Sequence, residues 1–408
     1  MSEIDKVGYT LLNTNEEGYS LDNLDNGNNS NMTIKMPEEV PKKKRERVYW
    51  IDCLRVFASI LVVFHHTNFS QIAEVPNEDF NSFNFKVLYF YNTFTRPCVP
   101  FFIMISGVFF LNPERRVTIG SIYKKNLFRI FKGFVFWSIY YNVFDYLVIN
   151  FTNFPFVYNK DLAVEVFKFC VLGLGHLWYL PFVFGLYAVT PIYREVARNT
   201  EVAIYTAILC VFLAQFIPFI VDFVQLFFNF DIGLIKSFFD YTLTYTALGY
   251  TNYFMMGYLF GCIDFKKKSY IYITYLVGIV GIVGTTIIKL MAANKVQQDN
   301  NYFGDYNSFN VSMSTVGIFC FFKYTIGPRL NKLMEIDILK SLLLTLSDCS
   351  YGVYLIHYTV YHIFIKFGIN SVSLNPIFWL PIYTMIIYLI SFVLIYAMRK
   401  VSILREIT

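Results

Sequence analysis

Long apolar runs separated by short polar segments dominate the chain after its first 47 residues. A run of about 20 apolar residues can cross a bilayer as a helix. Ten such runs predict helices at 48–69, 86–111, 127–149, 176–194, 202–224, 241–263, 270–290, 308–327, 347–367 and 377–398. Pro218 in the fifth run and Lys323 in the eighth depart most from the pattern. The pattern predicts an all-α, polytopic transmembrane bundle of about ten helices.

The first 47 residues have the opposite character. Residues 1–40 are rich in Asn, Asp, Glu and Ser, so they cannot bury enough surface to offset the entropy of an ordered chain. Residues 41–47 are basic and directly precede the first apolar run, which is typical of a cytosolic flank that attracts anionic lipid. We therefore predict a disordered cytosolic tail at 1–47 with a basic juxtamembrane cluster, and one membrane domain at 48–408. A cleavable signal peptide is not expected, because the amino-terminal segment is polar.

The loops between the apolar runs predict the topology. With the amino terminus in the cytosol, Lys and Arg are concentrated in the loops on that side, whereas the first outside loop carries Glu74, Glu78 and Asp79. This positive-inside bias alternates at every crossing. An odd number of helices would break the alternation, so we predict that both termini are cytosolic.

Composition supports an integral, multi-pass membrane protein. Of the 408 residues, 56% are hydrophobic and 15% are charged, and the mean hydropathy is +0.46, whereas a soluble domain is nearer half apolar and a quarter charged. The net charge of +5 arises in short loops and indicates topology rather than binding to nucleic acid. The seven cysteines lack metal-ligand or redox spacing, so we predict packing roles for them and no metal site.

The first run, 49–68, carries the most informative polar residues. Asp52 and Arg55 lie near its start, and His65 and His66 lie near its end; ionisable side chains inside a membrane helix tend to mark a function. At about 100° per residue, Arg55 and His66 lie about 20° apart on one helix face, whereas His65 lies about 80° away. Arg55 and His66 are also about 16 Å apart along the axis. They cannot touch, so the spacing predicts two ends of one path.

The second run contains a cation near the predicted middle of the membrane. Arg96 lies about ten residues into the run, and so at a depth of about 15 Å. It either pairs with a buried carboxylate such as Asp145 or faces a polar cavity within the bundle. Pro97 and Pro100 would free backbone carbonyls toward such a cavity. Ser106, in the same run, is either a site residue or a small helix-packing residue.

Two later runs supply the other candidate site residues. Tyrosines recur every three or four positions in the ninth run, as a stripe that either packs or forms part of a site. Tyr354 and His357 belong to this run, and His176 begins the fourth. Each histidine suits either a hydrogen-bonded structural role or proton transfer. The sequence contains no nucleophile elbow, phosphate loop or dinucleotide-binding motif.

These residues form an ordered set that resembles the acyltransferase-3 family of multi-pass membrane acyltransferases. The first run is similar to the family's helix in which a His follows an Arg by eleven positions and an Asp precedes that Arg by three. Further stretches resemble family motifs in the same order, namely Arg96 with 99–107, 124–129 with 136–138, 176–181 with 185–191, and 350–357. Cys53 and Val56 stand where many members have Gly, as in the branch that includes surface-polysaccharide acyltransferases.

The resemblance implies a donor, an acceptor and an arrangement of the site. Acyl-CoA, in the first place acetyl-CoA, would act as a cytosolic co-substrate with no permanently bound cofactor. The acceptor would be a hydroxyl of a glycan, lipid or small molecule on the far side. Arg55, with Asp52 beside it, would bind the donor, and Lys124, Lys125 and Arg129 would neutralise its phosphates.

At the other end of the path, His66 would act as general base on the acceptor hydroxyl. Arg96 would stabilise the developing oxyanion, and an acyl-histidine intermediate is an open alternative. Two other classes of function also stay open. Intramembrane Arg, His and Asp side chains suit a proton-coupled transporter, although the internal repeat common in transporters is not evident. An inactive family member would bind a lipid or a partner instead.

Overall fold

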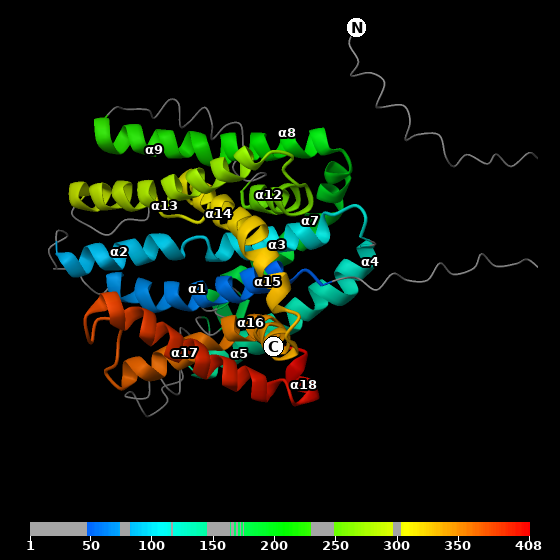
Figure 1. Ribbon diagram of the computed structural model, residues 1–408. Coiled ribbons are helices and arrows are strands. Elements are labelled where there is room, and N and C mark those ends of the chain that lie inside the picture. The colour runs from blue at the N-terminus through cyan, green and yellow to red at the C-terminus, as the bar shows by residue number, and fades with distance from the viewer. Residues whose placement is uncertain are drawn as a thin grey trace, which may run out of the picture. The chain divides into compact units, whose positions relative to one another are not determined.

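The computed structural model of the protein describes residues 47–73, 82–115, 117–144, 175–229, 249–296 and 303–408, and a few single residues between 164 and 173. Its contacts divide the chain into two units, Met1–Arg47 and Val48–Thr408. The predicted disordered tail, apart from Arg47, lies outside the described residues. Within the second unit every regular element of the described residues is a helix (Figure 1), which confirms the all-α class.

Each of the ten predicted runs contains a helix. Four helices are continuous, namely α1 (Tyr49–Ala73), α13 (Lys268–Val296), α16 (Asp337–Lys366) and α17 (Pro376–Met398). The interrupted ones are α2 (Phe83–Thr95) with α3 (Cys98–Phe110), α4 (Ile119–Ser121) with η2 (Ile122–Leu127) and α5 (Phe128–Phe144), η5 (Gly175–Trp178) with α7 (Tyr179–Arg198), α8 (Thr200–Val211) with η6 (Phe212–Phe216) and α9 (Ile217–Phe228), and α14 (Phe309–Phe321) with η7 (Phe322–Ile326) and α15 (Gly327–Leu333). The shorter helices are α12 (Thr251–Cys262) and α18 (Ser402–Arg405).

Five helical stretches of the described residues are long and apolar enough to cross a membrane. They are Tyr49–Asn68, Phe83–Phe110, Thr200–Phe228, Lys268–Val296 and Pro376–Met398. Five such stretches are in agreement with the prediction of a membrane protein. The total of about ten crossings and the cytosolic side of both termini stay predictions.

The break between α2 and α3 occurs where the sequence places a proline. Pro97 has no backbone N–H and restricts the residue before it. The Arg96 N–H closes the last turn of α2 on the Thr93 carbonyl at 3.2 Å, and the Phe101 N–H opens α3 on the Pro97 carbonyl at 3.0 Å. The predicted loosening of the backbone therefore lies at Arg96 and Pro97, and Pro100 falls within the first turn of α3.

The two least regular runs keep their helices by way of π turns. Pro218 lies in the first turn of α9, directly after η6, where a missing N–H is tolerated. Lys323 lies in η7, and its ammonium group donates to the carbonyls of Phe260 and Ile263, both at 3.0 Å. The lysine thus reaches the carbonyl end of α12 rather than ending its own helix.

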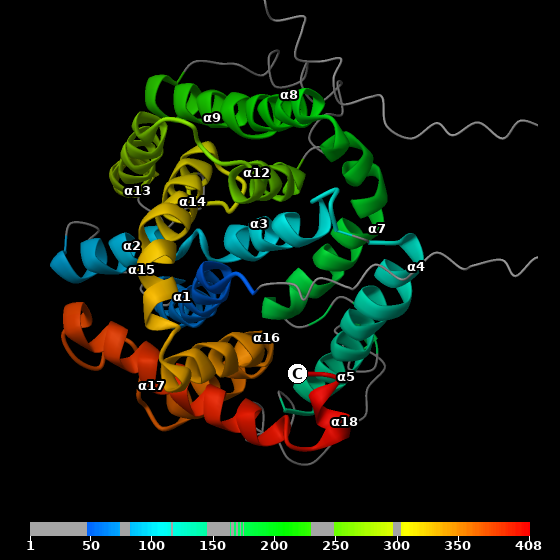
Figure 2. The ribbon, with the colours of Figure 1, turned by 45° about the vertical axis from the view of Figure 1, so that its right-hand side comes forward.

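Helix α1 lies at the centre of the second unit. It packs against α2, α3, α16 and α17 and against the segment from η7 to α15. Figure 2 shows α1 between α3 on one side and α16 on the other. Further out, α3 packs against α12, and α13 packs against α14 and α2. The run with the most informative polar residues is therefore also the run with helices on several sides.

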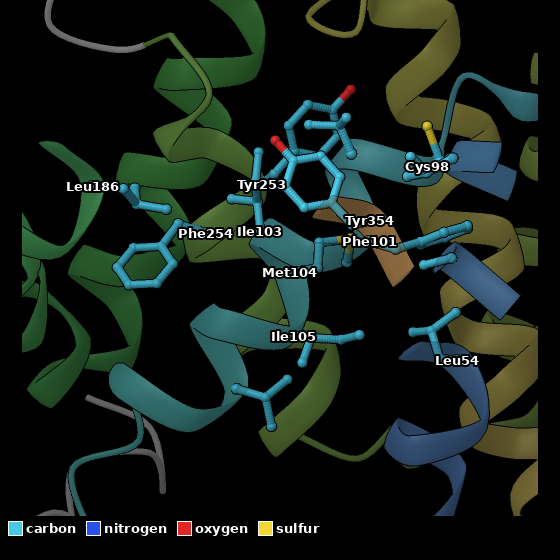
Figure 3. Packing of buried hydrophobic residues seen from close by; sticks show 14 of the residues in the cluster. Leu54, Cys98, Phe101, Ile103, Met104, Ile105, Leu186, Tyr253, Phe254 and Tyr354 are labelled. Atoms are coloured by element: carbon cyan, nitrogen blue, oxygen red, sulfur yellow. The ribbon is translucent and has the colours of Figure 1, made fainter. Parts of the chain in front are cut away.

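Glycines let α3 and α12 meet backbone to backbone. A Cβ atom on Gly107 would lie 2.0 Å from the Phe254 carbonyl oxygen, and one on Gly257 would lie 2.1 Å from the Met104 carbonyl oxygen. Ile103, Met104 and Phe254 are buried around this contact (Figure 3). Any larger residue at either glycine would push the helices apart. The contact fixes the position of α3, which forms one wall of the cavity described next.

Candidate active site

A cavity of about 400 Å³ lies between α1, α3, α5, α7 and α16. Side chains from these helices, from η2 and η5 and from Tyr306 line it, and most of them are aromatic or aliphatic. Arg55 and His66 are both on its wall. Because α1 is continuous between them, the two side chains reach one cavity from positions about 16 Å apart along the helix axis.

A buried carboxylate positions the guanidinium at the Arg55 end. The Arg55 Nη1 atom donates to Asp52 Oδ1 at 3.2 Å and to Ser347 Oγ at 3.0 Å, and the Ser347 hydroxyl donates to the same carboxylate oxygen at 2.6 Å. The Asp52 side chain is 5% exposed, against 26% for Arg55. Asp52 is not on the cavity wall and orients Arg55, so its predicted part in the donor site, beside Arg55, stays a prediction. Ser347 of α16 was not predicted, since its sequence context gives no sign of this contact.

A second cation, Arg129 of α5, lies on the same cavity wall. Its Nη2 atom donates to the main-chain oxygen of Thr408 at 3.1 Å, and its guanidinium carbon lies 5.7 Å from the centre of the Tyr351 ring. Lys124 and Lys125 in η2 are exposed and are not on that wall. The predicted phosphate-binding set is thus divided between one residue on the cavity wall and two on the surface.

Three histidines from three separate segments meet at the other end. His66 of α1 and His176 of η5 line the cavity, whereas His357 of α16 is fully buried and not on the wall. The centre of the His357 ring lies 5.2 Å from that of His66 and 5.4 Å from that of His176. The ring centres of His66 and His176 are 6.2 Å apart. In the described part of the chain, no group of three or more His, Cys, Asp or Glu side chains is arranged to hold a metal ion.

Ser106 and Tyr354, each predicted as a site or packing residue, both line the cavity. The Ser106 hydroxyl lies 3.4 Å from the Tyr187 hydroxyl. The Tyr354 hydroxyl donates to the main-chain carbonyl of His176 at 2.6 Å, so it ties η5 to α16 and helps to place His176. The stripe thus has residues in both environments, because Tyr361 is packed in the hydrophobic core, and the site role of Tyr354 stays a prediction.

Arg96 is buried but is not on the cavity wall. Its Nε and Nη2 atoms donate to Asn92 Oδ1 at 3.2 and 3.0 Å, and the Lys289 ammonium group donates to the same oxygen at 2.8 Å. The Tyr306 ring lines the cavity, with its centre 5.6 Å from the Arg96 guanidinium carbon. The oxyanion role of Arg96 stays a prediction, and Asp145, its alternative partner, lies outside the described residues. Lys289 was missed, although a lysine inside an apolar run is itself a signal.

His65 occupies a different environment from its neighbour His66. It is buried, its Nδ1 atom lies 3.1 Å from the Thr95 hydroxyl, and it is not on the cavity wall. This placement agrees with the separate helix face expected from the spacing. The contact with α2 suits a structural role for His65.

Comparison with known proteins identifies the family. A family model described as an acyltransferase domain matches residues 48–402. No curated protein and no solved structure matches the chain. The matched range includes nearly all of the second unit and every cavity residue described above. The chain therefore belongs to the acyltransferase-3 family of membrane acyltransferases, and it is an acyltransferase.

Proposed function

We propose that this enzyme is a multi-pass membrane O-acyltransferase. It moves an acyl group, in the first place acetyl, from cytosolic acyl-CoA to a hydroxyl of a glycan, lipid or small molecule on the other side of the membrane. The observation that carries the proposal is a single cavity with cations at one end and imidazoles at the other. Family membership favours this activity over the proton-coupled transporter, the alternative that the polar residues alone left open.

The cationic end suits the donor. Arg55 and Arg129 both reach the cavity, and the planar guanidinium group binds phosphate oxygens in pairs. The pantetheine arm of coenzyme A equals about four to five residues of extended chain, or about 15 Å. This length is close to the axial separation of about 16 Å between Arg55 and His66. A donor held at Arg55 would therefore bring its thioester to His66.

The imidazole end suits proton transfer. As the acceptor oxygen attacks the thioester carbonyl, His66 takes the hydroxyl proton. The carbon–sulfur bond then breaks, and the same proton passes to the sulfur of the leaving coenzyme A. The products are an ester and a free thiol, with no net change at His66. His176, on the same wall, is the alternative base.

The test measures donor binding and turnover separately in the purified, full-length protein. Acetyl-CoA at about 100 times its Kd should add about 2.7 kcal/mol of stability, which is seen as a higher Tm in detergent. Turnover is followed as release of coenzyme A thiol with a panel of alcohols and glycosides. We expect His66→Ala to abolish turnover and keep the thermal shift, and Arg55→Gln to reduce the shift. His65→Asn is the matched control and should retain both.

The outcomes separate the parts of the proposal. Full turnover in His66→Ala would remove the base assignment. A missing thermal shift with every acyl-CoA tried would remove the donor assignment. A thermal shift without turnover in the unmodified protein would identify an inactive binding member of the family.

A further inference from the structure

His357 has a defined tautomer that the reaction outlined above does not use. Its Nδ1 atom lies 2.7 Å from the Tyr354 carbonyl oxygen and 3.3 Å from the Val353 carbonyl oxygen, both in α16. A carbonyl oxygen only accepts hydrogen bonds, so Nδ1 carries the hydrogen. In the neutral ring the lone pair is then on Nε2. The helix backbone thus fixes which nitrogen of His357 can accept a hydrogen bond.

That acceptor nitrogen is buried without a partner among the described residues. The His357 side chain is 0% exposed, and Nε2 makes no hydrogen bond there. A buried polar atom that stays unpaired costs stability, so such an atom calls for an explanation. A working hydrogen bond formed during the reaction would provide one.

His66 is at the right distance to supply this bond. Two imidazole rings joined by an N–H···N bond of about 2.9 Å have centres roughly 5 Å apart. The ring centres of His66 and His357 are 5.2 Å apart, with an angle of 39° between the ring planes. The separation of the ring centres therefore matches that of two imidazoles joined by such a bond.

We propose that His357 is a positioning residue for His66, and this inference rests on the proposed function. Nε2 of His357 accepts a hydrogen bond from one ring N–H of His66. The other nitrogen of His66, which then carries the lone pair, faces the cavity and the acceptor hydroxyl. When that hydroxyl gives its proton to His66, the bond to His357 becomes charge-assisted and stronger. The proton leaves His66 for the coenzyme A sulfur, and His357 is never protonated.

Two substitutions test the two ring nitrogens of His357 separately. The side-chain nitrogen of His357→Asn can keep the donor at the place of Nδ1 but leaves nothing at Nε2. The amide oxygen of His357→Gln can accept at the place of Nε2. We expect Asn to lower kcat about 100-fold, within the range of general-base effects, with the donor KM and Tm unchanged. Gln should restore kcat to within about 10-fold of the unmodified enzyme.

Several results would overturn the proposal. Unchanged kcat in His357→Asn would show that Nε2 has no part in turnover. Equal losses of kcat in Asn and Gln, or losses that follow Tm, would assign His357 a different role. In a His176→Gln background the loss caused by His357→Asn should persist, and its disappearance would assign Nε2 to His176. If His66→Ala is inactive while His357→Asn is active, only the positioning role fails; if His66→Ala is active, the proposed base fails first.

Discussion

The contact between α13 and α14 gives a stability prediction with an internal control. Gly281 of α13 is buried against α14, where an added Cβ atom would lie 2.5 Å from the Ser314 nitrogen and 2.9 Å from the Asn310 carbonyl oxygen. Gly284 is one turn further along the same helix, and an added Cβ atom there would meet nothing within 4 Å. Alanine at these two positions therefore tests packing with helix, residue type and membrane environment held constant.

The expected magnitudes follow from these distances. Two of the obstructing atoms at Gly281 belong to the backbone, and the third, Met313 Cβ at 2.9 Å, is bonded directly to it. None of them can rotate away, so the helices must separate. Overpacking of this kind costs about 1–3 kcal/mol, offset in part by a gain of up to about 1 kcal/mol from the higher helix propensity of alanine. Gly284→Ala should show only the gain. The helix-propensity gain is common to both variants, so they should differ by the overpacking cost alone, about 1–3 kcal/mol in the free energy of unfolding.

Thermal melting in detergent measures this difference. With the unfolding entropy typical per residue, about 1 kcal/mol corresponds to about 1 °C in a chain of this size. Gly281→Ala should therefore melt about 1–3 °C below Gly284→Ala. The order of the two variants is the decisive result. Equal melting temperatures, or a more stable Gly281→Ala, would refute the close approach of α13 and α14 at this point.

Three other predictions concern side-chain contacts. Ser347→Ala removes a hydroxyl from the Arg55 end, worth about 1 kcal/mol, so the donor KM should rise about five-fold in the thiol-release assay with kcat unchanged. Asn92→Leu removes the oxygen shared by two buried cations and should cost about 2–4 kcal/mol of stability, measured by thermal melting. Thr93→Val is the control, because it removes a buried hydroxyl that has no partner among the described residues. This control should be neutral or stabilising. Lys132 donates to the exposed Glu406 carboxylate and lowers its pKa. The contact therefore stabilises the protein above the ordinary carboxyl pKa, and this stabilisation is lost as the pH falls through the lowered pKa. In an NMR titration, Lys132→Met should raise the pKa of Glu406 back toward its ordinary value.

The helices could be predicted because their signals are local. An apolar run of membrane length predicts a helix wherever it occurs, and each of the ten runs contains one. The break at Arg96 and Pro97 also has a local cause, the missing N–H of proline. The π turns η6 and η7 have no comparable signal, since they depend on how a helix is accommodated between its neighbours. The sequence therefore indicates that Pro218 and Lys323 are irregular positions, but it does not indicate how the helix accommodates them.

The candidate site likewise has features that local sequence signals predict and features that depend on packing between helices. Arg55 and His66 could be placed on one face because helix geometry relates residues eleven positions apart. His176 and His357 could be named as candidates, but their meeting with His66 depends on the packing of η5 and α16 around α1, which spacing in one sequence does not give. Ser347 was missed for the same reason. Lys289 is different, because a lysine inside an apolar run is visible in the sequence without any knowledge of packing.

The adjacent histidines of α1 show why the helix face matters more than the residue type. His65 and His66 are chemically identical, yet a rotation of about 100° places one against the Thr95 hydroxyl of α2 and the other on the cavity wall. The second position also shares its face with Arg55, and the rigid helix between them holds the two at one separation. In the proposed reaction, a donor anchored at Arg55 would therefore meet an imidazole at a fixed distance, because helix α1 would supply both the anchor and the base.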